Sequence, residues 1–153
     1  MISKHISLDD AIKSDTGKSG KIDNTPSEAA LVYMRDVAEK CFEPMIEWYD
    51  KTITINSFYR CKELNTIVGG LTTSSHILGQ AIDLTTESLT DNKLLFVWCA
   101  ENLEFDELIC EYYYSWIHIS YVAGNNRNRI LNEKLEEINY KTSLPLKNNR
   151  RMC

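Results

Sequence analysis

Two runs of strand-forming residues, 107–112 and 116–121, lie close together in the chain and constrain its fold more than any other feature. A connection as short as 113–115 joins antiparallel strands, because a parallel connection would need a dozen or more residues. We therefore predict a β-hairpin. The second run also alternates in polarity, which places Trp116, His118 and Ser120 on one face of the strand and Ile117, Ile119 and Tyr121 on the other.

A long helix is predicted in the N-terminal half. Thr25 is the expected N-cap, Pro26 the first helical residue, and Glu28 the acidic partner in a capping box. Apolar residues then recur three and four positions apart, as on one face of a helix, down to about Phe42, and Glu43-Pro44 is expected to break or redirect the chain. The residues of this stripe are Leu31, Met34, Val37 and Cys41.

Shorter patterns predict the remaining elements. Residues 1–20 are polar and are expected to form a lead-in, in which Ser7 caps a helical turn that begins at Leu8. Strands are expected over 51–57 and 81–84, and helices over 59–70, 90–102 and 130–138, with Leu94, Leu95, Val97 and Trp98 on the buried side of the second helix. This order predicts an α+β fold, in which helices pack a small, mostly antiparallel sheet.

A chain of 153 residues has the length of one domain. We expect that domain to span 1–124 and residues 125–153 to form a C-terminal extension. The extension ends in a basic stretch, which is either a solvated end or a contact for an anionic surface. Its charged residues are Lys141, Lys147, Arg150 and Arg151.

Composition and charge argue against several classes of protein. The net charge is −5 and no long basic run is present, so we expect no nucleic-acid partner. No stretch approaches about 18 apolar residues and the N-terminus lacks an apolar signal core, so we expect no membrane span and synthesis in the cytoplasm without a signal peptide. The five cysteines are scattered without a CxxC pair, which favours free, mostly buried thiols over disulfides or a thiolate zinc site.

Only three histidines are present, and two lie in the segments least suited to packing. His76 and Asp83 flank Gly79 in the pattern Ser-x-His-x-x-Gly-x-Ala-x-Asp, and side chains on the two sides of a glycine turn can converge on one cation. His118 would be a third ligand, with a fourth position left for water as in catalytic zinc sites. The alternative is that both histidines are hydrogen-bonded structural residues. His5 is expected to be exposed to solvent.

Between Ile6 and Tyr121, several motifs follow one another in a fixed order. They are Ile22-Asp23-Asn24-Thr25-Pro26, Ser57-Phe58-Tyr59-Arg60, Leu64-Asn65 with Val68-Gly69-Gly70, Ser74-Ser75-His76, Gly79-Gln80-Ala81-Ile82-Asp83, Phe105-Asp106, Glu111, and Trp116-Ile117-His118-Ile119-Ser120. In these motifs the chain resembles the M15 zinc peptidases, the D-Ala-D-Ala carboxypeptidases and L-alanyl-D-glutamate endopeptidases that share a fold with the hedgehog signalling domain. It is most similar to small single-domain members from bacteriophages and prophages.

The resemblance implies one zinc ion per chain, held by His76, Asp83 and His118. It also implies Glu111 as the general base and acid, and Arg60 as the cation that grips the substrate and stabilises charge on the scissile carbonyl. The position of Glu111 in the sequence agrees with this role, since it ends the strand immediately before the turn that presents His118. The alternatives are a rim carboxylate for Glu111 and a structural salt-bridge partner for Arg60.

Residues around this set leave further alternatives open. Ser74 either supports the site and its substrate or shapes the turn. Trp116 stands where some relatives carry a second histidine, Glu107 where many have glutamine, and Ser115 where another family pattern has the catalytic acid. The aromatic cluster forms either hairpin packing or a wall that binds a peptide substrate, and its members are Tyr112, Tyr113, Tyr114 and Trp116.

The resemblance therefore predicts a zinc peptidase domain over 1–124 that hydrolyses an amide bond in the peptide stem of bacterial peptidoglycan. The enzyme would be a D-Ala-D-Ala carboxypeptidase-type enzyme or a phage endolysin, acting on the cell wall in the periplasm or from the virion. We also expect a monomer. The alternatives are a non-catalytic zinc module that binds a partner, and a wall-binding protein that keeps only the fold.

Overall fold

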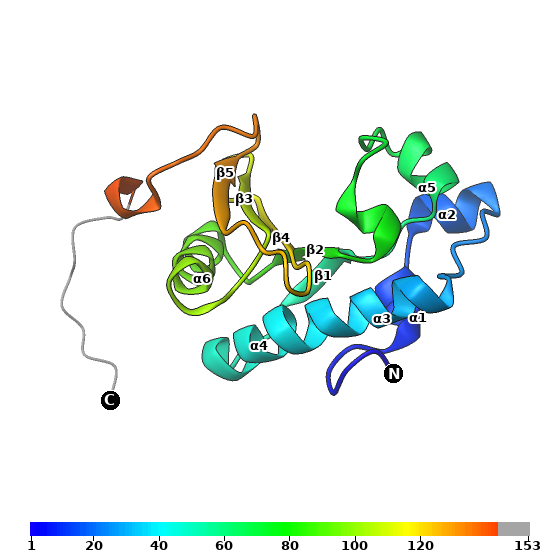
Figure 1. Ribbon diagram of the computed structural model, residues 1–153, viewed down its shortest axis with the longest axis horizontal. Helices are drawn as coiled ribbons and strands as arrows, with labels where there is room; N and C mark the ends of the chain where they lie inside the picture. Colours follow the sequence, from blue (N-terminus) through cyan, green and yellow to red (C-terminus); the bar gives the residue numbers. More distant parts are fainter. Residues whose placement is uncertain (144–153) are drawn as a thin grey trace.

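A five-stranded sheet lies at the centre of the computed structural model, which describes residues 1–143 (Figure 1). The strand order is β1-β2-β4-β3-β5, and all neighbours are antiparallel except β3 and β5. The predicted hairpin is confirmed as β3 and β4, and with it the α+β class. The strands are β1 (Thr54–Ser57), β2 (Ala81–Thr85), β3 (Glu107–Glu111), β4 (Trp116–Ser120) and β5 (Arg129–Asn132).

Helix α6 packs beside β3 and β4, while α3, η1 and α4 form one continuous rod that runs past the sheet, and α2 and α5 lie together at one end of the molecule (Figure 1). Helices near the expected ranges 59–70 and 90–102 are confirmed as α5 and α6. The α-helices are α1 (Leu8–Ile12), α2 (Asp15–Gly20), α3 (Glu28–Val37), α4 (Glu43–Tyr49), α5 (Lys62–Ile67) and α6 (Leu89–Asn102). The π-helix η1 is Ala38–Phe42, and the 3-10 helices are η2 (Ser75–Leu78) and η3 (Tyr140–Ser143). No helix among residues 1–143 is both long and apolar enough to span a bilayer.

The two faces of the sheet differ sharply in character. On β2 and β4, Ile82 pairs with Ile119 and both side chains are fully buried in one core with residues of α3 and α6. The next pair along the strands, Asp83 and His118, points to the other face because side chains alternate along a strand. One face therefore stabilises the fold by burying aliphatic surface, and the other is left for polar residues.

The start of the long helix differs from the prediction. Helix α3 begins at Glu28, and the N-cap is Ser27, whose side chain accepts a hydrogen bond from the Ala30 N–H at 3.2 Å. Thr25 is not the cap, because its own N–H donates to the Asp23 carboxylate at 3.0 Å and holds the preceding turn outside the helix. The capping box expected at Thr25, Pro26 and Glu28 is therefore wrong by two residues.

The helix does not break at Glu43-Pro44. A π-helical turn, η1, precedes the proline, and the Glu43 N–H donates to the Ala38 carbonyl five residues earlier. Proline in a regular helix clashes with the carbonyl four residues before it. The wider turn relieves this clash, so the rod continues through α4 to Tyr49.

The helix predicted over 130–138 is also wrong, because residues 129–132 form β5. This strand runs parallel to β3, and Leu131 pairs with Ile109 and makes an isolated antiparallel bridge to Glu137. The outer edge of β3 offers unpaired main-chain donors and acceptors, and pairing with them outweighs the helix-like spacing of the apolar residues. The boundary at 124 stays a prediction, although β5 belongs to the same sheet. Of the basic tail, residues 144–153 lie outside the described residues.

The N-terminal residues are more than a lead-in. Ser7 caps α1 as predicted, in a reciprocal capping box with Asp10. Ile2, Ile6 and Ala11, however, are buried in the core, so this segment packs as part of the domain.

The buried side of α6 is also shifted from the prediction. Leu94 is 50% exposed, whereas Leu95 is buried and Val97 and Trp98 are half-buried. The fully buried residues of α6 are Asn92, Leu95, Phe96 and Cys99. The expectation of free thiols is confirmed for the four described cysteines, of which Cys41, Cys99 and Cys110 are buried and Cys61 is half-buried.

Candidate active site

A cleft of about 600 Å³ lies over the polar face of the sheet. Three parts of the chain form its walls: the loop and 3-10 turn over 68–76, the β3–β4 hairpin, and residues of the segment 127–135. Each sequence-predicted site residue lines this cleft, namely Arg60, Ser74, His76, Asp83, Glu111, Trp116 and His118. The fold therefore brings residues that span almost sixty positions of the chain to one place.

His76, Asp83 and His118 form the one group in the described chain that could hold a metal ion, with one potential ligand atom from each within 4.8 Å of the others. The His76 Nε2 lies 3.1 Å from Asp83 Oδ2, and the His118 Nδ1 lies 2.8 Å from Asp83 Oδ1. The register of the sheet explains why Asp83 and His118 lie side by side, because Asp83 on β2 and His118 on β4 are direct cross-strand partners. His76 reaches them from η2, which ends in the turn at Gly79.

The orientation of His76 matters for the chemistry of the group. Its Nδ1–H donates to the Phe58 carbonyl at 2.6 Å, since a carbonyl can only accept. In the neutral ring, Nε2 then carries a lone pair and no hydrogen. This Nε2 is buried, has no hydrogen-bond partner, and faces the Asp83 carboxylate. Two electron-rich atoms thus face each other, an arrangement that a cation between them would stabilise.

The ionisation states of these residues agree with such a site. Burial lowers the pKa of His76, against the opposing effect of the Asp83 charge, so the ring stays neutral and able to act as a ligand. Burial alone would raise the pKa of Asp83, but the two neighbouring histidines outweigh it and bring that pKa well below its usual range. His76 is therefore a neutral imidazole and Asp83 an ionised carboxylate, the forms that metal ions bind.

Glu111 lies next to this group on the same face of the sheet. It pairs across the hairpin with Trp116, which is two residues from His118 on β4. Partial burial raises the pKa of Glu111, and the negative charges of Asp83 and Glu133 add to that effect against His118. A carboxyl group with a raised pKa beside a possible metal site is suited to carry a proton in either direction.

Arg60 approaches from the β2 side of the cleft. Burial lowers the pKa of its guanidinium and the nearby Asp83 raises it, and a guanidinium remains charged at any ordinary pH. Its Nε is buried and donates to none of the described residues. Arg60 therefore brings a cation to the wall of the cleft.

Asn24 holds the main chain on both sides of Arg60, a role that the sequence motifs did not reveal. Its Nδ2 donates to the Tyr59 carbonyl at 3.1 Å, and its Oδ1 accepts from the Cys61 N–H at 2.7 Å. The Arg60 N–H in turn donates to the His76 carbonyl at 3.2 Å. Asn24 stands in one of the motifs shared with the family, which was the only signal in the sequence.

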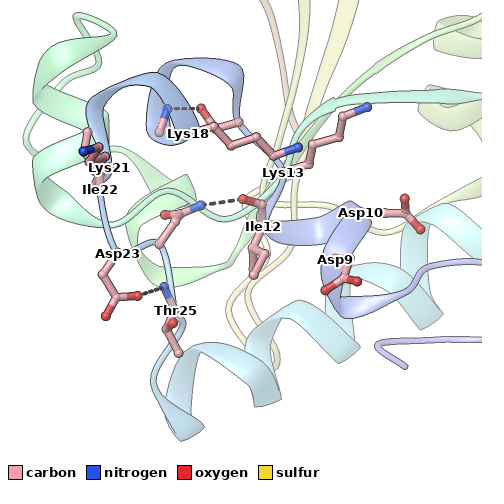
Figure 2. Close-up of a pocket in the computed structure, with 12 residues that line it drawn as sticks. Asp9, Asp10, Ile12, Lys13, Lys18, Lys21, Ile22, Asp23 and Thr25 are labelled. Carbon is pink, nitrogen blue, oxygen red and sulfur yellow. Dashed lines mark hydrogen bonds between the residues drawn. The ribbon is translucent and has the colours of Figure 1, made fainter.

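A second cleft, of about 580 Å³, lies between α1, α2 and the segment 21–25, and Asn24 is among the residues that line it (Figure 2). Lysine and aspartate side chains are among those that line it, and the carboxylate of Asp23 accepts a hydrogen bond from the Thr25 N–H. Asn24 donates to the Ile12 carbonyl at 2.9 Å from this side. The aspartates that line it do not come together as a group of potential metal ligands, unlike His76, Asp83 and His118.

The remaining candidates divide between packing and the cleft. Tyr114 packs against Phe96 of α6, whereas Tyr112 and Trp116 contact each other with ring centroids 5.1 Å apart and line the cleft. Ser74 shapes its turn through main-chain bonds, and its side chain makes no capping hydrogen bond. His5 is exposed and lies 2.6 Å from the Glu43 carboxylate, away from the metal group.

Comparison with known proteins agrees with this site. No curated protein matches the chain. Among protein families, residues 4–120 match the family described as Peptidase M15, and this range includes every candidate residue from Asn24 to His118. The chain belongs to the Peptidase M15 family, whose members are metallopeptidases.

Proposed function

We propose that the protein is a zinc-dependent peptidase that hydrolyses an amide bond in the peptide stem of peptidoglycan, as a D-Ala-D-Ala carboxypeptidase-type enzyme or an endolysin. Membership of the family supports peptidoglycan as the substrate. The observation that best supports a bound metal ion is the environment of His76 Nε2. This atom is buried, lacks a hydrogen, and faces the Asp83 carboxylate.

His76 would hold the ion through Nε2, His118 through Nδ1, and Asp83 through a carboxylate oxygen. Imidazole and carboxylate are ordinary ligands of Zn²⁺, and three protein ligands leave a position open for chemistry. The Phe58 carbonyl orients the His76 ring, as the partners of metal-binding histidines commonly do. When bound, zinc supplies Lewis acidity, which polarises a carbonyl group and lowers the pKa of water.

Glu111 would carry the proton. Its carboxylate lies beside His118 on the floor of the cleft and can take a proton from the attacking water and deliver it to the leaving amine. Its raised pKa brings it closer to neutral pH, where one group can serve first as base and then as acid.

Arg60 would bind the carbonyl oxygen of the scissile amide. The oxygen gains negative charge as water adds, and a half-buried cation in the cleft stabilises that charge more than it stabilises the starting amide. Burial strengthens this effect because the surrounding dielectric is low.

The test is to measure zinc in the purified protein, incubate it with muropeptides, and identify the products by mass spectrometry. Loss of terminal D-Ala would identify a carboxypeptidase, and cleavage after L-Ala an endopeptidase. The control is Glu111→Gln, which we expect to keep zinc and to lose turnover by about 10²–10⁴-fold.

Each other outcome contradicts part of the proposal. If the purified protein contains no stoichiometric zinc, the proposed zinc site is wrong. If Glu111→Gln turns over substrate at the wild-type rate, Glu111 is not the general base. Zinc-loaded protein that binds muropeptides without cleaving them would instead be a non-catalytic binding module.

A further inference from the structure

The segment after β4 contributes to the cleft although it lies beyond residues 4–120, the part that matches the family. Arg127 and Leu135 from this segment line the same cleft as the candidate metal ligands. β5 fixes both residues in place, because it pairs with β3 between them. Residues outside the range that matches the family thus form one wall of the cleft.

The side chain of Arg127 is 50% exposed, yet two carboxylates bind its guanidinium group. Its Nε and Nη2 donate to the two oxygens of Asp106 at 2.7 and 2.6 Å, a bidentate pair. The Nη2 also lies 3.0 Å from the Glu107 carboxylate. Asp106 itself is buried, so the guanidinium is anchored from below and cannot swing freely.

This anchoring leaves one edge of the guanidinium unused. An arginine carries five N–H donors, of which the Nε–H and one Nη2–H bind Asp106, while Nη2 also forms an ion pair with Glu107. Nη1, with two N–H groups, makes no hydrogen bond to residues 1–143. A rigid cation with an unused Nη1 in a cleft is suited to bind a carboxylate oxygen through a charge-assisted hydrogen bond.

Arg127 and Arg60 lie on opposite sides of the metal group. In the sheet, His118 of β4 pairs with Ile109 of β3, and Glu107, which contacts Arg127, is two residues further along β3. Two residues correspond to about 7 Å along a strand. Arg60 instead lies beside Asp83 and His76, on the β2 side. A substrate stretched across the sheet would meet one arginine on each side of the metal.

We propose that Arg127 is a specificity-determining residue that binds a carboxylate of the substrate through Nη1, on the side of the metal group away from Arg60. This proposal rests on the proposed function and names its substrate class: stem peptides with a free carboxylate at that position, in preference to the same peptides with a carboxamide. A carboxylate accepts from Nη1 in a hydrogen bond that is charged on both sides, whereas a carboxamide carries no charge and its oxygen accepts a weaker bond.

The test compares matched peptides in which each carboxylate of the stem, in turn, is free or amidated. For one such pair we expect kcat/KM to favour the free acid by about tenfold or more, mainly through KM, and we expect Arg127→Gln to remove this preference. The control is Arg129→Gln. Arg129 pairs with the same Glu107, at 3.2 Å, but does not line the cleft, so its variant should keep the preference.

Two further measurements separate this proposal from other failures. Arg127→Gln could lose stability because Asp106 is left unpaired. In that case the peptides are compared on the double variant Asp106→Asn with Arg127→Gln, in which two neutral amides replace the ion pair. Calorimetric binding of the acid and amide peptides to Glu111→Gln protein gives a readout that does not require turnover. The role of Arg127 is wrong if the wild type prefers the free acid in no pair of peptides, or if Arg127→Gln keeps the same preference. If the wild type cleaves no stem peptide at all, the proposed function is wrong instead.

Discussion

At the scale of single residues, Asn24 links the N-terminal segment to the cation of the site. We expect Asn24→Ala to keep zinc, because Asn24 contacts none of the three metal-binding candidates. The variant should lose about 1–3 kcal/mol of stability from the unpaired main-chain groups, and kcat/KM should fall by about one to two orders of magnitude as Arg60 shifts. Metal analysis, denaturant unfolding and kinetics on one preparation measure all three effects. Unchanged kinetics with reduced stability would make Asn24 a purely structural residue.

The residues of the site differ in how well the sequence predicts them. His76, Asp83 and His118 belong to short motifs whose spacing follows from a turn and a strand, so the sequence alone brings them to attention. The Phe58 carbonyl cannot be found in this way, because every residue type has one and only the fold places it beside His76. Arg127 lies in the segment that the sequence indicates only as a C-terminal extension, and its partners are brought to it only when the sheet forms.

At the scale of elements, the turn between His76 and Asp83 depends on Gly79. Its φ is +79°, and a Cβ atom at this position would lie 2.8 Å from the Ala30 carbonyl oxygen and 2.7 Å from Met34 Cγ. Gly124 has a similar φ of +74° but faces open space, which makes it a matched control. We expect Gly124→Ala to cost about 1–2 kcal/mol from backbone strain alone.

Gly79→Ala should cost about 1–3 kcal/mol more than the control, because α3 must move to admit the methyl group. Urea unfolding of the two metal-free variants gives the comparison directly. Equal losses in the two variants would show that the close contact with α3 does not constrain this turn.

The ion pair between Asp106 and Arg127 ties the start of β3 to the segment before β5. Hydrogen bonds from the Arg127 side chain lower the pKa of Asp106, although burial opposes them. A group whose pKa is lower in the folded state stabilises the protein above its unfolded pKa, and this contribution is lost as the pH falls through the folded pKa. We therefore expect metal-free Asp106→Asn to be less stable than wild type at pH 7, with the difference shrinking below about pH 4. A difference that stays constant across this range would rule out the ion pair as its source.

The elements that the sequence mispredicts share a physical cause. The apolar residues around β5 are spaced as in a helix, but the open edge of β3 pairs with them, and that edge is distant in sequence. Pro44 is a strong helix breaker in isolation, yet the π-turn before it leaves the rod intact. The hairpin and the strands 54–57 and 81–85, whose patterns are local, were predictable.

At the scale of the whole molecule, the candidate ligands join three separate elements, η2, β2 and β4. A metal ion that binds only the folded state stabilises it by about 2.7 kcal/mol at a hundredfold excess over Kd. For a protein of this size, that corresponds to a rise in Tm of about 5–10 °C. We expect zinc to raise the Tm of the metal-free protein in this way, and His118→Ala to abolish the shift. Calorimetry measures the Tm of both proteins with and without zinc. If zinc raises the Tm of His118→Ala by the same amount as that of the wild type, zinc binds at another site.

Core and site residues alternate along the same strands, with Ile82 and Ile119 on one face and Asp83 and His118 on the other. Selection can therefore act on the two faces separately. Replacements on the polar face change what the cleft recognises and leave the aliphatic packing untouched, so a lineage can acquire new substrates, or lose its chemistry and keep a binding surface, without first losing its fold. The same property makes this sheet a suitable starting point for engineering: a library of variants confined to the polar face would consist mainly of folded proteins.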